Sequence, residues 1–298
     1  MDLSDSLKTE IIPTKLYKFL SHDSENLTIT GICKGNIKFS KIPDLNDSSE
    51  EYAYANFEEF HRSVSKIFGS ECTPDVFRKL GKHLDLMDKI LPKKGFGKIK
   101  NVFLQFAKMI CGNNPELGSV LSQDKELFEV LESKLTQIHK EILSKVGILC
   151  LTDRLDYFPM WAHYADEARG FAVEFKDLHQ CFNGDETDVL HQIDPVKYRG
   201  QRGQVSMMPS DLSEIFRTKL EDWKEEREYR VTELLTQCES DNDKKIHLYH
   251  IDCKYISRII VGWKCPDNRF EIIKENADIA GIEVVRLRMD EHGKIVPA

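Results

Sequence analysis

Trp223-Lys224-Glu225-Glu226-Arg227-Glu228-Tyr229-Arg230-Val231 organises this chain of 298 residues. Its pattern predicts that a charged helix over 214–223 runs straight into a β-strand that begins near Glu226. Side chains alternate along a strand, so Glu226, Glu228 and Arg230 are expected on one face. Neighbouring carboxylates raise each other's pKa unless a cation or a positively charged ligand holds both ionised. Two interpretations are open: a solvated edge strand in which Arg230 pairs with a glutamate, or the wall of a site.

Composition is that of an ordinary globular protein. Hydrophobic residues make up 41% and charged residues 31% of the chain, which is long enough to bury a sizeable core. The net charge of -8 argues against broad nucleic-acid binding, because phosphate contacts need a basic surface. The start of the chain has no apolar signal segment, and no apolar run approaches the length of a membrane span. We therefore expect a cytoplasmic protein without a membrane partner.

The eight cysteines are scattered, without the close pairs that a zinc site needs. Several have apolar neighbours, as Cys150 does between Leu149 and Leu151. Buried free thiols in a reducing compartment are the expected state of these residues. The sequence predicts no disulfide and no metal site.

The amino-terminal region predicts short elements. Strands are expected over 16–20 and 37–40, with a helix over 26–34 between them. In the first strand Tyr17 and Phe19 share one face and Lys18 lies on the other. The loop Pro43–Asp47 follows the second strand, and such a loop can line a pocket.

A helical pattern extends from Tyr52 to about Lys145. Its clearest part is 124–145, where apolar residues recur at three- and four-residue spacing: Leu127, Leu131, Leu135, Ile138 and Ile142. We predict a single domain over 1–298 that carries a helical insertion at about 52–145.

The second half alternates strands and helices. The continuous apolar run 146–151 predicts a strand covered on both faces, at the centre of the sheet. Further strands are expected over 171–175, 195–198 and 246–251, and a strand-helix-strand unit over 256–261, 266–280 and 282–287. The predicted fold class is α+β, with a mixed or split β-sheet core.

A helix over 158–166 is the second candidate for a site. Pro159 lies in its first turn, and Met160, His163 and Tyr164 share a face. Two interpretations remain here as well. Trp161 and Tyr164 are either core aromatics beside a structural His163, or part of a pocket wall that stacks a planar ligand.

Several segments together resemble the bacterial domain-of-unknown-function family 2971. They are Leu16-Tyr17-Lys18-Phe19, Lys38-Phe39-Ser40 with Leu45-Asn46-Asp47, Met160-Trp161-Ala162-His163-Tyr164-Ala165 with Gly170, and Lys219 with Trp223, Glu226, Glu228 and Arg230. They are spread over most of the chain in the family's order, although the helical stretch carries none of the resemblance. The family name implies no activity.

At greater distance, the chain is similar to the ADP-ribosyltransferase superfamily. The shared pattern is an aromatic-basic-aromatic first strand, a helix-borne tyrosine and a late Glu-x-Glu strand. This similarity implies an NAD-consuming enzyme with an ADP-ribosyltransferase-like fold, possible roles being a toxin or a phage-defence effector. The acceptor would be a protein, a nucleic acid or a small molecule.

The similarity also implies roles for single residues. Glu228 would bond the ribose hydroxyl, Glu226 would orient the acceptor, and Tyr164 would stack on nicotinamide. Lys18 stands where the superfamily usually has His or Arg to hold the nicotinamide ribose. The expected catalytic residues are therefore Glu226 and Glu228, and the expected NAD-binding residues are Tyr17, Lys18, Trp161, His163, Tyr164, Lys219 and Arg230, the last two being candidates for the pyrophosphate.

Two other functions are compatible with the same residues. In a metal-dependent nuclease or hydrolase, Glu226, Glu228 and Asp166 would bind a divalent cation through oxygen. In a non-catalytic sensing or interaction protein, the pocket would bind a nucleotide without turnover and the helical insertion would dock a partner.

Overall fold

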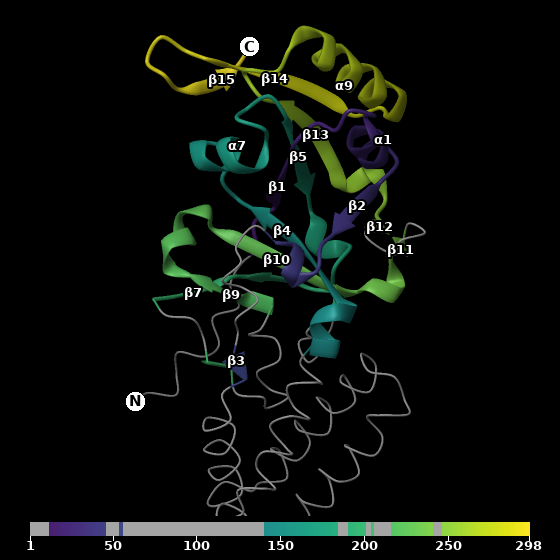
Figure 1. Ribbon diagram of the computed structural model, residues 1–298. Helices are drawn as coiled ribbons and strands as arrows, with labels where there is room; N and C mark the ends of the chain where they lie inside the picture. The colour runs from purple at the N-terminus through teal and green to yellow at the C-terminus, as the bar shows by residue number, and fades with distance from the viewer. Residues whose placement is uncertain are drawn as a thin grey trace, which may run out of the picture.

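A mixed eight-stranded sheet forms the centre of the protein (Figure 1). The computed structural model describes residues 12–45, 54–55, 140–183, 190–200, 204–205, 216–240 and 246–298. The strands of the large sheet, in spatial order, are β15 (Ile295–Pro297), β14 (Glu283–Met289), β13 (Ile256–Val261), β5 (Phe171–Lys176), β1 (Lys15–Leu20), β4 (Val146–Thr152), β10 (Glu228–Leu234) and β6 (Ile193–Pro195). β13 and β14 are parallel, whereas the other neighbours are antiparallel. This arrangement confirms the α+β class.

Smaller sheets flank the large one. Three strands, β11 (Glu239–Ser240), β12 (His247–His250) and β2 (Asn36–Phe39), form one of them. Two parallel pairs are β7 (Lys197–Arg199) with β9 (Thr218–Leu220), and β3 (Tyr54–Ala55) with β8 (Gln204–Val205). The 3₁₀ helices are η2 (Ile42–Asp44), η4 (Leu178–Gln180), η6 (Glu221–Glu226), η7 (Leu235–Gln237) and η8 (Cys253–Tyr255).

Helices cover both faces of the sheet beside β1 and β5. On one face α7 (Phe158–Tyr164) packs Trp161 against Phe19, with the ring centroids 4.9 Å apart. On the other face lie α1 (Leu27–Cys33) and α9 (Asp267–Ala280), which bury Ile29 and Ile273 in the larger core cluster (Figure 1). α9 follows Pro266 and ends at Gly281, whose φ of 68° suits a glycine. The burial of apolar side chains on both faces holds the sheet in place.

β4 has the central position that its apolar run predicts, between β1 and β10. It pairs with β10 at seven positions, from Glu228 opposite Thr152 to Leu234 opposite Val146. With β1 it pairs at one position only, Tyr17 opposite Thr152, although both strands are fully described. Further along the same strand, Ile148 instead forms a bridge with Ser40 after β2. β1 and β4 therefore diverge, and the end of β2 lies beside β4 where β1 has moved away.

The charged segment before β10 differs from its prediction. β10 begins at Glu228 rather than Glu226, because Arg227 has a left-handed backbone with φ of 47° and separates the two glutamates. Residues 216–217 are helical as predicted, but Lys219 lies in β9 and residues 221–226 form η6, so the predicted helix over 214–223 was wrong from residue 218 onward. Short 3₁₀ turns and a three-residue strand are too brief to give a periodic signal.

The strands around residue 196, the carboxy-terminal unit and the predicted insertion at 52–145 agree with the sequence analysis to different degrees. The predicted strand over 195–198 is two strands, β6 and β7, interrupted at Val196, whose N–H donates to the carbonyl of Glu228. The strand-helix-strand unit at the end of the chain is confirmed, and the added strand β15 was not predicted. Most of the predicted insertion at 52–145 lies outside the described residues; 140–145 are helical as expected, whereas 54–55 form β3.

The described cysteines, Cys33, Cys150, Cys181, Cys238, Cys253 and Cys265, are free thiols. Across the described ranges, no cluster of three or more His, Cys, Asp or Glu side chains could hold a metal ion. None of the helices described here is both long enough and apolar enough to cross a membrane.

Candidate functional site

A cavity of about 360 Å³ opens where β1 and β4 diverge. Its volume is at the lower end of the range for small-molecule sites. The lining comes from β1, β2, η2, β4, α7, β9, η6 and β10: Tyr17, Lys18, Phe19, Leu20, Ser21, Lys38, Ser40, Asp44, Leu45, Cys150, Leu151, Thr152, Met160, His163, Tyr164, Lys219, Glu226 and Glu228. Of the nine site residues expected from the sequence, all but Trp161 and Arg230 line this cavity.

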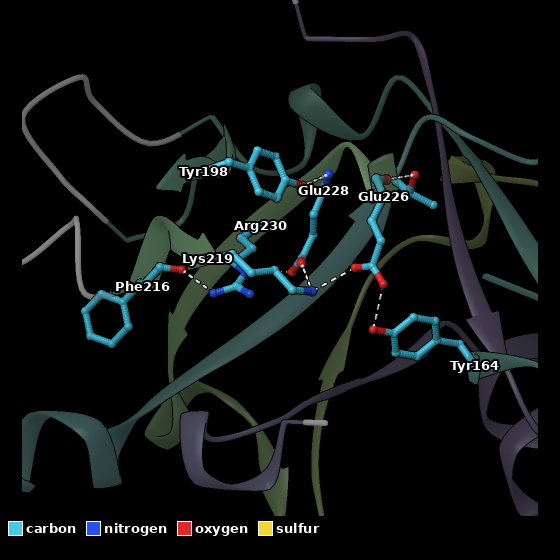
Figure 2. A network of polar contacts seen from close by, with 8 residues as sticks. Tyr164, Tyr198, Phe216, Lys219, Glu226, Glu228 and Arg230 are labelled. Carbon is cyan, nitrogen blue, oxygen red and sulfur yellow. Dashed lines mark hydrogen bonds and ion pairs between the residues drawn. The ribbon is translucent and has the colours of Figure 1, made fainter. Parts of the chain in front are cut away.

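The floor of the cavity is a lysine held between two glutamates. Lys219 Nζ donates to Glu226 Oε2 at 2.7 Å and to Glu228 Oε2 at 2.8 Å (Figure 2). The three side chains are only 4–5% exposed. Ion pairs this deeply buried persist only when their geometry and hydrogen bonding are good. The shared ammonium resolves the repulsion between two neighbouring carboxylates that the sequence pattern implied.

Backbone contacts fix the two glutamates on separate elements. Thr152 Oγ1 donates to the carbonyl of Glu226 at 2.5 Å, which ties the end of η6 to β4. The N–H of Glu228 donates to the hydroxyl of Tyr198 at 2.8 Å, which ties the start of β10 to β7. Figure 2 shows that both side chains converge on the lysine from these two anchors. Convergence thus depends on the turn at Arg227 and not on a shared strand face.

Arg230 lies on the same face of β10 as Glu228, as strand alternation predicts. Its Nε donates to Glu228 Oε1 at 2.6 Å, and its Nη1 donates to the carbonyl of Phe216 at 2.9 Å. The guanidinium is 1% exposed and does not line the cavity. Two cations and two carboxylates therefore form a neutral buried group, the floor cluster of Lys219, Glu226, Glu228 and Arg230.

The charges within the floor cluster determine the protonation states of Glu228 and Lys219. Burial alone would raise the pKa of Glu228, but Arg230 and Lys219 outweigh it and hold the pKa well below the usual range. Burial would likewise lower the pKa of Lys219, but the charges of Glu228 and Glu226 outweigh it and raise the pKa. At neutral pH Glu228 is ionised and Lys219 is protonated. Neither group is poised to exchange a proton near pH 7.

Tyr164 connects α7 to the floor. Its hydroxyl donates to Glu226 Oε1 at 3.0 Å, and burial raises its pKa well above the ordinary value for tyrosine. The imidazole of His163 lies edge-on to Tyr164 and to Trp223, with centroid distances of 6.3 and 6.4 Å. Trp223 also lies under Lys219, whose Nζ is 5.0 Å from the centroid of its indole. These residues form one aromatic wall beside the floor cluster.

β1 supplies the opposite wall. The hydroxyl of Tyr17 donates to the buried Glu174 at 3.1 Å, and burial together with Glu174 raises the pKa of this phenol to about 12. The Glu174 carboxylate also pairs with Arg258 at 2.9 Å. Tyr17 is therefore held rigidly, with its ring at the cavity and its hydroxyl directed to a second ion pair.

Trp161 has a structural environment. Its side chain is fully buried, and its indole N–H donates to the carbonyl of Leu155 at 2.8 Å. It packs between Phe19 and Trp263 in the core cluster of α7. This is the core-aromatic interpretation of the helix, and it separates Trp161 from its neighbours His163 and Tyr164.

Sequence patterns point less directly to several other residues in or beside the cavity. Lys38, Ser40 and Asp44 come from β2 and η2, whose position beside β4 depends on long-range pairing. Lys38 and Ser40 belong to the motif Lys38-Phe39-Ser40, and Asp44 belongs to the loop that was expected to line a pocket. The motif and the loop could therefore have identified these three residues as candidates for the cavity lining. Tyr198 had no signal, because its role depends on the pairing of β7 with β9.

The geometry favours ligand binding through charge and hydrogen bonds. Each oxygen of Glu226 has one donor among the described residues, Tyr164 or Lys219, and since an oxygen has two lone pairs it can accept another hydrogen bond from a ligand hydroxyl. Glu228 accepts from Lys219, Arg230 and the thiol of Cys150, so its two oxygens together can accept one more. A divalent cation shared by Glu226 and Glu228 would have to displace Lys219, which already occupies the position between them. The aromatic wall provides a surface for a planar group.

Comparison with known proteins finds one family. The model of the family described as protein of unknown function (DUF2971) matches residues 160–231. This segment carries most of α7 and the whole floor cluster, and it supports the resemblance noted in the sequence. No curated protein and no solved structure matches the chain.

Proposed function

We propose that this protein is an NAD-consuming enzyme of the ADP-ribosyltransferase type, which cleaves the nicotinamide glycosidic bond and transfers ADP-ribose to an acceptor. The observation that carries the proposal is the ionised carboxylate of Glu228 in the wall of a cavity, held ionised by Lys219 and Arg230. Breaking this bond passes through a state with positive charge on the ribose. A preorganised carboxylate next to the ribose stabilises that charge.

The surroundings of Glu228 support the same assignment. Glu226 keeps a lone pair on each oxygen for ribose hydroxyls, and Glu228 keeps one beyond its bonds from Lys219, Arg230 and Cys150. Tyr164 and His163 offer a wall for the nicotinamide ring. Glu226, which accepts from Tyr164 and Lys219, is the group that would orient an acceptor.

A second candidate is a nucleotide-binding protein without turnover. It is favoured by the charge balance of the floor cluster, in which Lys219 and Arg230 already neutralise both carboxylates. A neutral cluster stabilises a developing cation less than a lone carboxylate does. The two candidates bind similar ligands and differ in whether the glycosidic bond breaks.

One experiment separates them. The purified protein is incubated with NAD carrying a label in the adenylate half, alone and with a cell extract, and free nicotinamide and labelled macromolecules are measured. The enzyme predicts nicotinamide release and a labelled acceptor, both lost in Glu228→Gln. Binding of NAD in calorimetry without nicotinamide release under either condition contradicts the enzyme and supports the binding protein. A matched control is Glu225→Gln, since Glu225 is exposed and lies outside the cavity.

A further inference from the structure

We infer that Lys18 and Lys38 form an anion-binding subsite at the rim of the cavity, which holds the phosphate groups of a nucleotide ligand. The inference rests on the proposed function in one respect, because it takes the diphosphate of NAD as the natural ligand group. It also changes an expectation from the sequence, which gave the pyrophosphate to Lys219 or Arg230.

First, the floor is a poor site for a phosphate, although Lys219 lines the cavity. Lys219 uses two of its three donors on Glu226 and Glu228. Arg230 is 1% exposed behind Glu228 and does not reach the cavity. A phosphate that approached the floor would also meet two ionised carboxylates. A dianionic ligand group therefore has to be held elsewhere in the cavity.

The second step is the charge of the rim. Lys18 and Lys38 line the cavity, and among the residues that the structure describes no carboxylate forms an ion pair with either of them. Asp44 is the one rim carboxylate in the described lining. The described part of the rim thus carries two cations and one anion above a neutral floor, and this local positive charge attracts phosphate.

The third step is the placement of the two lysines. Lys18 follows Tyr17, and Tyr17 pairs with Thr152 of β4. Lys38 lies two residues before Ser40, and Ser40 forms a bridge with Ile148 of β4. These two contact points on β4 are four residues apart, which is about 13 Å along a strand. The lysines therefore reach the cavity from two different strands, β1 and β2, and their long flexible side chains can converge on a diphosphate between them.

The subsite also explains how a cavity of about 360 Å³ can serve a dinucleotide. This volume suits roughly the nicotinamide ribose half of NAD, given that drug-sized ligands occupy about 300–1,000 Å³. With the diphosphate at the rim, the adenosine half extends outside the cavity. Affinity then depends on the phosphates more than on the adenine base.

The test uses inorganic pyrophosphate and ADP-ribose as probes in isothermal titration calorimetry. Lys38→Met should weaken both by about fivefold, and Lys18→Met with Lys38→Met by at least about tenfold, as expected for charge-assisted hydrogen bonds at an exposed rim. Asp44→Asn should strengthen both about twofold, because it removes the opposing charge. Lys264→Met, an exposed lysine outside the cavity, makes the same change in net charge and should leave both affinities unchanged.

The outcomes separate this inference from the proposed function. Pyrophosphate affinity that falls in Lys38→Met and not in Lys264→Met supports the subsite, even if the protein releases no nicotinamide from NAD. No binding of either probe, or equal affinities for the wild type and the double variant, overturns the subsite. Nicotinamide release with a KM for NAD that is unchanged by Lys18→Met and Lys38→Met also overturns the subsite, while leaving the proposed function intact. Thermal unfolding of each variant confirms that the fold is retained.

Discussion

Lys219→Met tests the charge balance of the floor most directly. The substitution keeps the length and apolar stem of the side chain but removes the ammonium between Glu226 and Glu228. Both Oε2 atoms lie within 2.8 Å of that ammonium, so they are at most about 5.5 Å apart. At an effective dielectric constant of about 20, two such charges repel by about 3 kcal/mol. This repulsion corresponds to roughly two pKa units.

The consequence is a stability loss that depends on pH. Removing one partner of a buried ion pair typically costs about 3–5 kcal/mol, and we expect a loss of this size at pH 8. Without Lys219, one carboxyl has a folded-state pKa above its unfolded value, so folding favours its protonated form. The variant then loses stability as the pH rises from the unfolded value towards the folded value. Relative to the wild type, the loss should be roughly 1–2 kcal/mol smaller at pH 5 than at pH 8.

Urea unfolding at pH 5 and pH 8, followed by circular dichroism, measures both quantities. Lys224→Met is the matched control, because Lys224 is exposed and its pair with Glu221 should contribute less than about 0.5 kcal/mol. A loss below about 1 kcal/mol at pH 8, or a loss that is equal at the two pH values, would refute the claim that Lys219 holds two ionised carboxylates together.

Three further predictions concern the surroundings of the site. Tyr164→Phe removes one hydrogen bond from the floor cluster and should lower the free energy of unfolding by about 1 kcal/mol in urea titrations. Gly170→Ala should cost at least about 2 kcal/mol, because the new Cβ would lie 2.2 Å from the carbonyl oxygen of Leu20. Gly31→Ala in α1 should instead stabilise by about 0.5–1 kcal/mol, because the new Cβ would lie 3.9 Å from the carbonyl oxygen of Asn36; thermal unfolding distinguishes the two variants. Folding lowers the pKa of Glu228, so the ionised carboxylate stabilises the fold above its unfolded pKa of about 4.3, and this stabilisation is lost as the pH falls below that value. The free energy of unfolding should therefore decrease less with falling pH in Glu228→Gln than in the wild type.

Local patterns in the sequence predicted the structural features that depend on a single strand or helix. The apolar run of β4 predicted a central strand, because a strand covered on both faces has no polar side to expose. The alternation of Glu228 and Arg230 predicted their contact, because the two side chains belong to one strand. The shared face of His163 and Tyr164 on α7 likewise predicted that both reach one cavity.

Features that depend on backbone exceptions or long-range pairing could not be predicted in this way. The left-handed Arg227 moves Glu226 off β10, and a non-glycine residue rarely adopts that conformation. Lys219 reaches the glutamates from β9, which is held by its pairing with β7. The position of Lys38 depends on the pairing of β2 with the distant β12 and on the bridge between Ser40 and Ile148. None of these contacts leaves a periodic pattern in the sequence.

We have proposed that Glu228 stabilises the breaking of the glycosidic bond of NAD. The measurement is the rate of nicotinamide release from NAD by the wild type, Glu228→Gln and Glu225→Gln at pH 7.5, each checked for folding by its unfolding midpoint. We expect the wild type and Glu225→Gln to release nicotinamide at similar rates, and the rate to be lower by about a hundredfold or more in Glu228→Gln. Release that is the same in folded Glu228→Gln as in the wild type would contradict it.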